Sequence, residues 1–315
     1  MRRFNNEEYR ALMEMLIDET FYTQSKYYDS KVQQIRKYTE IIVRRLTNYR
    51  CDYLLTLGHK NTTAELINKG VPETDSFFWD SLKVIIDKGN ARSHTKQTVL
   101  ATEEEYNQAV DSLFNLYAYL FIRFFRQCPF GSNLEIVTAF SILPPIIRYK
   151  ALNELYKEDP SNMLLVEKLV IAILKAFDKK SANDWIEKHK QELLVMQQSI
   201  PDEQKAALIA QFGPENAEVI MQSLTDNYYN ILSQKVEQLG DIFEKRGVLY
   251  KDFEEAVSYY KKYGIVDGDS QEIREFNSLM EFVYMGRKDR ERELASLADT
   301  DYMLDRVVLF VKPEF

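Results

Sequence analysis

The fold can be worked out from one stretch, Lys88-Gly89-Asn90-Ala91-Arg92-Ser93-His94, which lies between two apolar segments. The apolar pattern before it predicts a helix over Phe77–Lys88, and Asp75 or Ser76 can cap the start of that helix. Gly89 suits the left-handed position that ends many helices, so we expect residues 88–94 to form a polar turn.

A long apolar helix is predicted after this turn. Thr102 and Glu105 have the spacing of a capping box, in which each side chain bonds the backbone of the other residue, and they begin a helix that runs from Glu103 to Gln127. Its most apolar part, Leu113–Phe125, is shorter than the roughly 18 residues that a membrane span needs, and it contains Arg123. We interpret it as a buried core helix.

More helices are predicted on the N-terminal side, where apolar residues recur at the i, i+3, i+4 spacing of an amphipathic helix. The predicted segments are Asn6–Gln24, a helix from Asp29 to about Tyr49, and a short helix from Thr62 or Thr63 to Lys69. The Pro- and Gly-containing run Cys128–Asn133 marks the best domain boundary in the chain. Residues 1–128 therefore form one predicted helical bundle.

A second helical domain is predicted over residues 134–315. Pro144-Pro145 should split its first helix, and the later helices are expected over Pro160–Phe177, Ser181–Gln198, Pro201–Phe212, Pro214 to about Leu239, Gly240–Tyr263 and Gln271–Met285. The pairing of these helices resembles an α-solenoid, although no repeat has a fixed period. A terminal helix is expected after these, and the β-branched run Val307–Val311 allows a short docking strand there instead. Only 10 Gly and 8 Pro argue against sandwiches and barrels, so we predict an all-α protein.

Charge is unevenly distributed along the chain. Residues 1–128 carry 18 Lys and Arg against 17 Asp and Glu, whereas the remainder has a net charge of −9. Only the first part is therefore a plausible partner for a polyanion. Residues 26–50 hold seven basic residues against two acidic ones, and Arg36 and Arg44 lie two turns apart on one helix face. These charges either contact nucleic-acid phosphates or form a solvated helix face.

Several classes of function lack their signatures. Cys51 and Cys128 follow no metal-binding spacing, and the chain has no P-loop, Gly-x-Gly-x-x-Gly or Gly-x-Ser-x-Gly motif. The N-terminus lacks the apolar segment of a signal peptide. We therefore expect a cytoplasmic protein with reduced thiols that uses no cofactor and no metal and does not associate with a membrane.

The polar turn allows two interpretations. Asn90 and His94 can satisfy backbone groups at a helix end, as such residues do in many helical proteins. Alternatively, His94 transfers a proton near neutral pH, for which an imidazole is well suited, and Asn90 orients it or binds a phosphate oxygen.

Residues 26–127 resemble the HEPN superfamily, the helical domains of many prokaryotic toxins and defence ribonucleases, and resemble most the branch fused to some type I restriction subunits. The stretches that carry the resemblance are Ile35–Ile42, similar to an Arg-Lys-x-x-Glu pattern, Gly89–His94, similar to Gly-Asn-x-x-x-His, and Thr102–Glu105. The resemblance implies a defence or restriction-associated setting. It also implies a homodimer or heteromeric complex with residues 88–94 near the interface, and RNA or DNA as a candidate ligand.

The sequence departs from the active members of the family at one position. Active HEPN ribonucleases carry Arg-(polar)-x-x-x-His, in which the Arg aids phosphate binding and the His acts in metal-independent cleavage. Asn90 and His94 match this pattern, but Gly89 stands at the Arg position and Arg92 is displaced along the chain. The missing guanidinium removes a bidentate phosphate donor. The resemblance therefore favours a non-catalytic scaffold or interaction protein, and the alternative is a ribonuclease that uses His94.

Two further assignments concern charged residues. Glu40 matches a family position that contacts the motif, and it can equally pair with Arg36 or Arg44, each four residues away on the same helix. The candidate nucleic-acid contacts are Arg36, Arg44 and Arg92.

Overall fold

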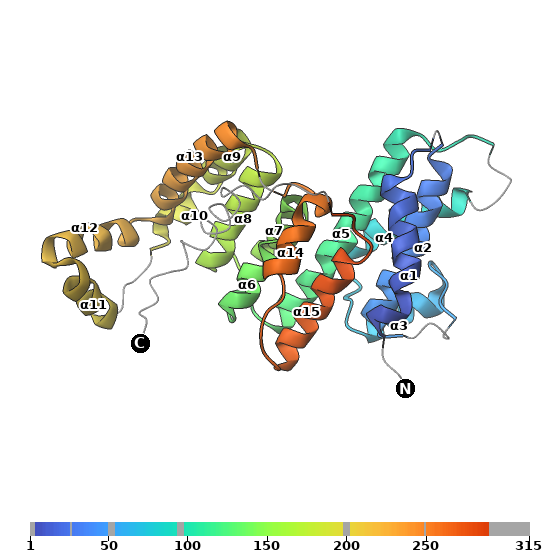
Figure 1. The fold of residues 1–315 in the computed structure, drawn as a ribbon, viewed down its shortest axis with the longest axis horizontal. Coiled ribbons are helices and arrows are strands. Elements are labelled where there is room, and N and C mark those ends of the chain that lie inside the picture. Colours follow the sequence, from blue (N-terminus) through green and yellow to red (C-terminus); the bar gives the residue numbers. More distant parts are fainter. Residues whose placement is uncertain are drawn as a thin grey trace. The chain divides into compact units, whose positions relative to one another are not determined.

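The computed structural model describes residues 4–25, 27–49, 54–92, 98–197, 202–248 and 250–289. Within these ranges the chain forms fifteen α-helices and one short π-helix, without a strand (Figure 1). The all-α prediction is confirmed. None of the described helices combines the length and the apolar character that a membrane crossing requires. The predicted run Val307–Val311 and Cys51 lie outside the described residues.

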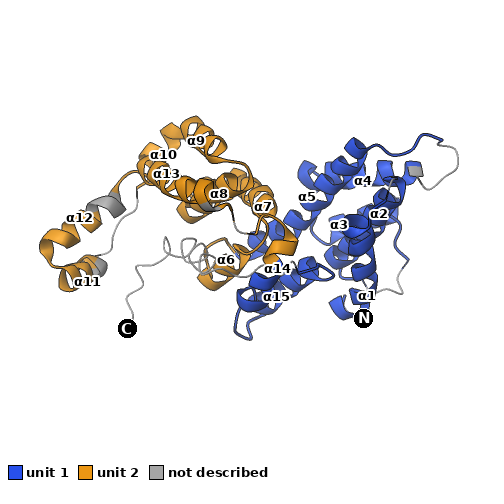
Figure 2. Cartoon of the chain, turned by 45° about the horizontal axis from the view of Figure 1, so that its top comes forward, with its two compact units in different colours: residues 1–128, 257–290 blue, residues 129–256, 291–315 orange. Residues whose placement is uncertain are grey.

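The chain divides into two compact units (Figure 2). Unit 1 comprises residues 1–128 and 257–290, and unit 2 comprises residues 129–256 and 291–315. The chain leaves unit 1 after Cys128 and returns to it within α14 (Phe253–Tyr263). Residues 257–290 thus belong with the N-terminal helices, whereas the predicted second domain, residues 134–315, includes them.

Unit 1 is built around one central helix. Its elements are α1 (Asn6–Ile17), the π-helix η1 (Asp18–Tyr22), α2 (Asp29–Thr47), α3 (Lys60–Asn68), α4 (Ser76–Arg92), α5 (Glu103–Gln127) and α15 (Gln271–Tyr284). Helix α2 packs against α1, η1, α3, α4 and α5. It buries Val32, Ile35, Tyr38, Ile41, Ile42, Val43 and Leu46, so more than one of its faces is covered.

The long helix α5 begins as predicted. Thr102 Oγ1 accepts the amide of Glu105, and Glu105 accepts the amide of Thr102 in return, which confirms the capping box. From Ala109 to Phe125 most of its residues are buried, as expected for a core helix.

Helix α15 completes the core of unit 1 with residues from the far end of the chain. The Phe276 ring lies 6.2 Å from the ring of Phe121 and 5.6 Å from that of Phe124. The Phe282 ring lies 6.2 Å from the ring of Tyr38 on α2. Because these aromatic rings are buried together, α15 is part of the hydrophobic core and not an appendage of it.

Unit 2 is also helical. Its elements are α6 (Leu134–Phe140), α7 (Pro145–Glu158), α8 (Met163–Ala176), α9 (Lys179–Lys188), α10 (Lys190–Val195), α11 (Asp202–Phe212), α12 (Pro214–Thr225), α13 (Tyr228–Arg246) and the first turn of α14. The predicted split at Pro144-Pro145 is present between α6 and α7. Helix α8 packs against α7, α9 and α13, and it is buried along most of its length.

Two of the helix boundaries in unit 2 that differ from the sequence prediction have a clear local cause. The single helix expected from Pro214 to about Leu239 is interrupted, because Asn227 caps a new helix by accepting the amide of Asn230 at 3.0 Å. Gly240, expected to begin a helix, lies inside α13, where an added Cβ would come within 2.8 Å of Lys179 Cδ. The helix ends instead at Gly247, which has a φ of +77°.

We expect Phe276→Ala to destabilise the protein strongly, because the fully buried ring would leave a cavity between α5 and α15. The free energy of unfolding should fall by about 3–5 kcal/mol in chemical denaturation followed by circular dichroism. Ile265→Ala in the same unit is the control, since Ile265 is 60% exposed and its loss should change stability by less than about 0.5 kcal/mol. Equal losses in the two variants would show that α15 is not part of the core.

Candidate functional site

The motif stretch is helical as far as the structure describes it. Helix α4 continues to Arg92, and Gly89 has ordinary helical backbone angles. The predictions that residues 88–92 form a turn and that Gly89 adopts the left-handed conformation are therefore wrong. Packing between α4 and α2 continues to Gly89, and this tertiary contact overrides the local preference of glycine for a helix end.

Gly89 is required by the close approach of α2 and α4. A Cβ at this position would lie 2.4 Å from Arg36 Cδ, 2.9 Å from its Cβ and 3.0 Å from its Cγ. Because the Arg36 Cβ is fixed to the backbone of α2, it cannot move away as the end of a flexible side chain would. Any side chain larger than hydrogen at position 89 must push the two helices apart.

The Arg36 side chain crosses Gly89 and turns back to its own helix. Its Nη1 donates to Glu40 Oε1 at 3.1 Å, one turn further along α2, and this ion pair is largely covered. Its buried Nε has no hydrogen-bond partner among the described residues. Arg36 therefore serves first as a packing element between two helices, with its charge directed at Glu40.

Glu40 lies within reach of two guanidinium groups. Burial raises the pKa of its carboxyl, whereas the positive charges of Arg36 and Arg44 act in the opposite direction. Of the two interpretations of Glu40, the structure shows the pairing with Arg36 directly.

Two other basic residues of α2 also have partners inside unit 1. The Lys31 Nζ lies 5.4 Å from the centre of the Tyr106 ring, and Arg45 donates to Glu275 at 2.9 Å with only 10% of its side chain exposed. Arg44 is half-buried, and Lys37 is exposed. Lys31, Arg36 and Arg45 thus direct their charges at partners within unit 1.

The remaining motif residues are not brought together by the described structure. Asn90 is exposed near the end of α4. Arg92 is the last residue of α4, and its side chain is not described. His94 lies outside the described residues. The candidate residues that the described structure brings together are Arg36, Glu40 and Gly89.

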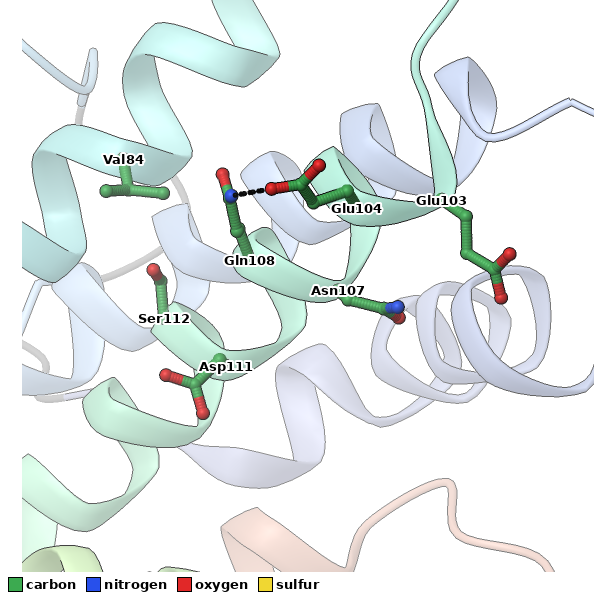
Figure 3. A pocket seen from close by; sticks show the side chains of 7 residues that line it. All are labelled: Val84, Glu103, Glu104, Asn107, Gln108, Asp111 and Ser112. Carbon is green, nitrogen blue, oxygen red and sulfur yellow. Dashed lines mark hydrogen bonds between the residues drawn. The ribbon is translucent and has the colours of Figure 1, made fainter.

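An acidic depression lies between Val84 of α4 and the N-terminal part of α5, and we call it the acidic shelf (Figure 3). It is open, has a volume of about 680 Å³, and is lined by Val84, Glu103, Glu104, Asn107, Gln108, Asp111 and Ser112. Gln108 Nε2 donates to Glu104 Oε1 at 3.2 Å. Val84 and Lys88 are four residues apart on α4, so the shelf and the start of the motif share a face of that helix.

In the described ranges, no three His, Cys, Asp or Glu side chains lie close enough together to hold a metal ion.

We expect Gly89→Ala to destabilise the protein by about 1–3 kcal/mol, the typical cost of overpacking. At an ordinary helix position the same change stabilises by about 1 kcal/mol, so the sign of the effect tests the packing. Repeating it in an Arg36→Ala background removes the contacts with Cγ and Cδ and leaves the one with Cβ. The penalty should shrink, with a coupling of about 0.5–3 kcal/mol in a double-mutant cycle. A stabilising Gly89→Ala, or an equal penalty in both backgrounds, would exclude this contact.

No protein-family model, no curated protein and no solved structure matches the chain. The assignment of residues 26–127 to the HEPN superfamily accordingly stays a prediction from the sequence.

Proposed function

We propose that the chain is a non-catalytic, HEPN-like interaction protein that works in a complex, in a prokaryotic defence or restriction-associated setting. The observation that supports this proposal is the lack of space for a side chain at position 89. An arginine there would begin with a Cβ only 2.4 Å from Arg36 Cδ, so this fold has no room for the motif arginine. The position that active relatives use for phosphate binding is used here to pack two helices.

The alternative function is a metal-independent ribonuclease that uses His94. One observation favours it: Arg36 lies directly against Gly89, so a guanidinium from α2 is present beside the motif position. Its pairing with Glu40 competes with a phosphate for the same donors, and we therefore rank this function second.

The acidic shelf supports a protein partner over nucleic acid. Glu103, Glu104 and Asp111 of α5 place negative charge beside the α4 face that carries the start of the motif, and such charge repels a polyanion and attracts a basic surface. A heteromeric partner with a basic surface fits the shelf better than the identical shelf of a second copy, which would meet it with like charge. A homodimer would have to pair through other residues.

The first test is RNA cleavage. Purified protein should leave mixed end-labelled RNA as intact as His94→Ala does, with no difference in rate between the two. Faster cleavage by the unaltered protein would overturn the proposal. The Arg36→Gln variant then separates two forms of the alternative: loss of cleavage would mean that Arg36 replaces the motif arginine, and retained cleavage would mean that it does not.

The second test concerns the partner. The triple variant Glu103→Gln, Glu104→Gln, Asp111→Asn removes the charge of the shelf, and a basic protein that co-purifies with the chain from its host should be lost. The matched control, Asp202→Asn, Glu215→Gln, Glu218→Gln, removes the same charge from exposed residues of α11 and α12. Equal recovery of the partner with both triple variants would contradict a role for the shelf.

A further inference from the structure

A second cavity in unit 1 is lined by arginines from three helices, and we call it the arginine groove. It has a volume of about 890 Å³ and lies between Phe4, the C-terminal ends of α2 and α5, and the N-terminal half of α15. The three arginines are Arg45, Arg123 and Arg274. The groove is separate from the acidic shelf and from the Arg36–Gly89 contact, since they share no residue.

Arg123 is the fixed cation of the groove. Its Nη1 donates to the carbonyl of Leu46 at 2.7 Å and its Nη2 donates to the carbonyl of Lys69 at 2.6 Å, so it joins the C-terminal ends of α2 and α3. No carboxylate of the described residues lies within ion-pair distance of it. A guanidinium has five N–H donors, so others remain available for a ligand.

Arg45 lies close enough to Arg123 for the two charges to repel. Burial lowers the pKa of Arg45 first, Glu275 opposes this, and Arg123 lowers it further. Glu275 also acts on Arg123, so the two guanidinium groups have this carboxylate in common. The Oε1 of Glu275 accepts a hydrogen bond from Arg45 Nη2 at 2.9 Å. Arginine stays protonated near neutral pH. The inner part of the groove therefore holds the two positive charges of Arg45 and Arg123 against the one negative charge of Glu275.

The rim and the walls add recognition groups of other kinds. Arg274 is exposed at the rim, where its Nη1 donates to the carbonyl of Asp269. With Glu272 included, the charged residues that line the groove sum to one positive charge. The apolar lining residues are Phe4, Leu46, Leu120, Phe124 and Leu279.

We propose that the arginine groove binds a small organic oxyanion, with a phosphate or carboxylate held by Arg123 and Arg274 and an apolar or aromatic body against Phe4 and Phe124. Guanidinium groups bind both kinds of oxyanion through paired hydrogen bonds. A volume of this size suits a ligand of roughly nucleotide dimensions. Glu272 and Glu275 limit how much negative charge the groove accepts, which favours a compact anion over a polyanion.

Cys128 provides a built-in probe of the groove, because its thiol is among the lining groups. Burial raises the pKa of this thiol, and the carboxylates Glu272 and Glu275 raise it further. A neutral alkylating reagent therefore reacts slowly with it, and a bound anion both covers the thiol and disfavours its thiolate. Peptide mapping by mass spectrometry distinguishes alkylation of Cys128 from alkylation of Cys51.

The experiment measures the rate of alkylation of Cys128 by iodoacetamide in the full-length protein. The additives are adenosine monophosphate, inorganic phosphate, benzoate and uncharged adenosine, with ionic strength held constant by sodium chloride. We expect adenosine monophosphate to slow alkylation at least about threefold at saturation and adenosine to have no effect. Protection by phosphate but not by benzoate assigns the site to phosphate compounds. Protection by benzoate but not by phosphate assigns it to carboxylates. If no anion slows alkylation, or if adenosine slows it equally, the proposal fails.

Variants make the test specific to the groove. Arg274→Gln at the exposed rim should leave the fold intact and raise the anion concentration needed for half-protection about tenfold, as expected for the loss of a charged hydrogen-bond donor. Lys37→Gln removes the same charge from an exposed position on α2 that does not line the groove. Its half-protection concentration should be unchanged. Equal shifts in both variants would mean that general electrostatics, and not the groove, causes the protection.

Discussion

The close approach of α2 and α4, with the stem of Arg36 lying over Gly89, is the constraint on which the rest of unit 1 depends. A helix that is covered by five neighbouring elements has little access to water, so its polar residues need partners within the protein. Arg36 forms an ion pair with Glu40, and Arg45 forms one with Glu275. The hydroxyls of Thr39 and Thr47 donate hydrogen bonds to backbone carbonyls one turn earlier. The packing of one helix thus determines where the charges of the unit are directed.

Arginine has a consistent structural use in this unit. Arg123 joins two helix ends through backbone carbonyls, where a cation is also stabilised by the helix dipole. Arg287, just after α15, donates to the Tyr117 hydroxyl at 3.0 Å and lies over the Phe21 ring. In each case the long stem packs against apolar groups while the guanidinium satisfies a polar one. This explains how a segment with a local excess of basic residues can serve as a core helix.

Much of the fold was predictable because its signals are local. The capping residues Thr102 and Glu105 and the pair Pro144-Pro145 each act within a few residues, so the sequence alone places the corresponding helix ends. Gly89 illustrates the limit. A glycine after an apolar helical pattern looks like a helix end, and only the position of Arg36, more than fifty residues earlier, gives it another role. The return of α15 to unit 1 and the arginine groove depend on contacts across more than 140 residues, and the one sequence signal for them is Arg123 within an apolar run.

Residues 88–92 continue helix α4, which packs against α2, and do not form an open loop. Hydrogen–deuterium exchange followed by mass spectrometry measures this directly, because the amides of Gly89 to Arg92 are bonded to carbonyls one turn earlier only if α4 continues through them. A helix that continues to Arg92 predicts that these amides exchange slowly, on the time scale of the buried part of α2. Exchange of these amides as fast as in an unstructured chain, while α2 remains protected, would contradict it.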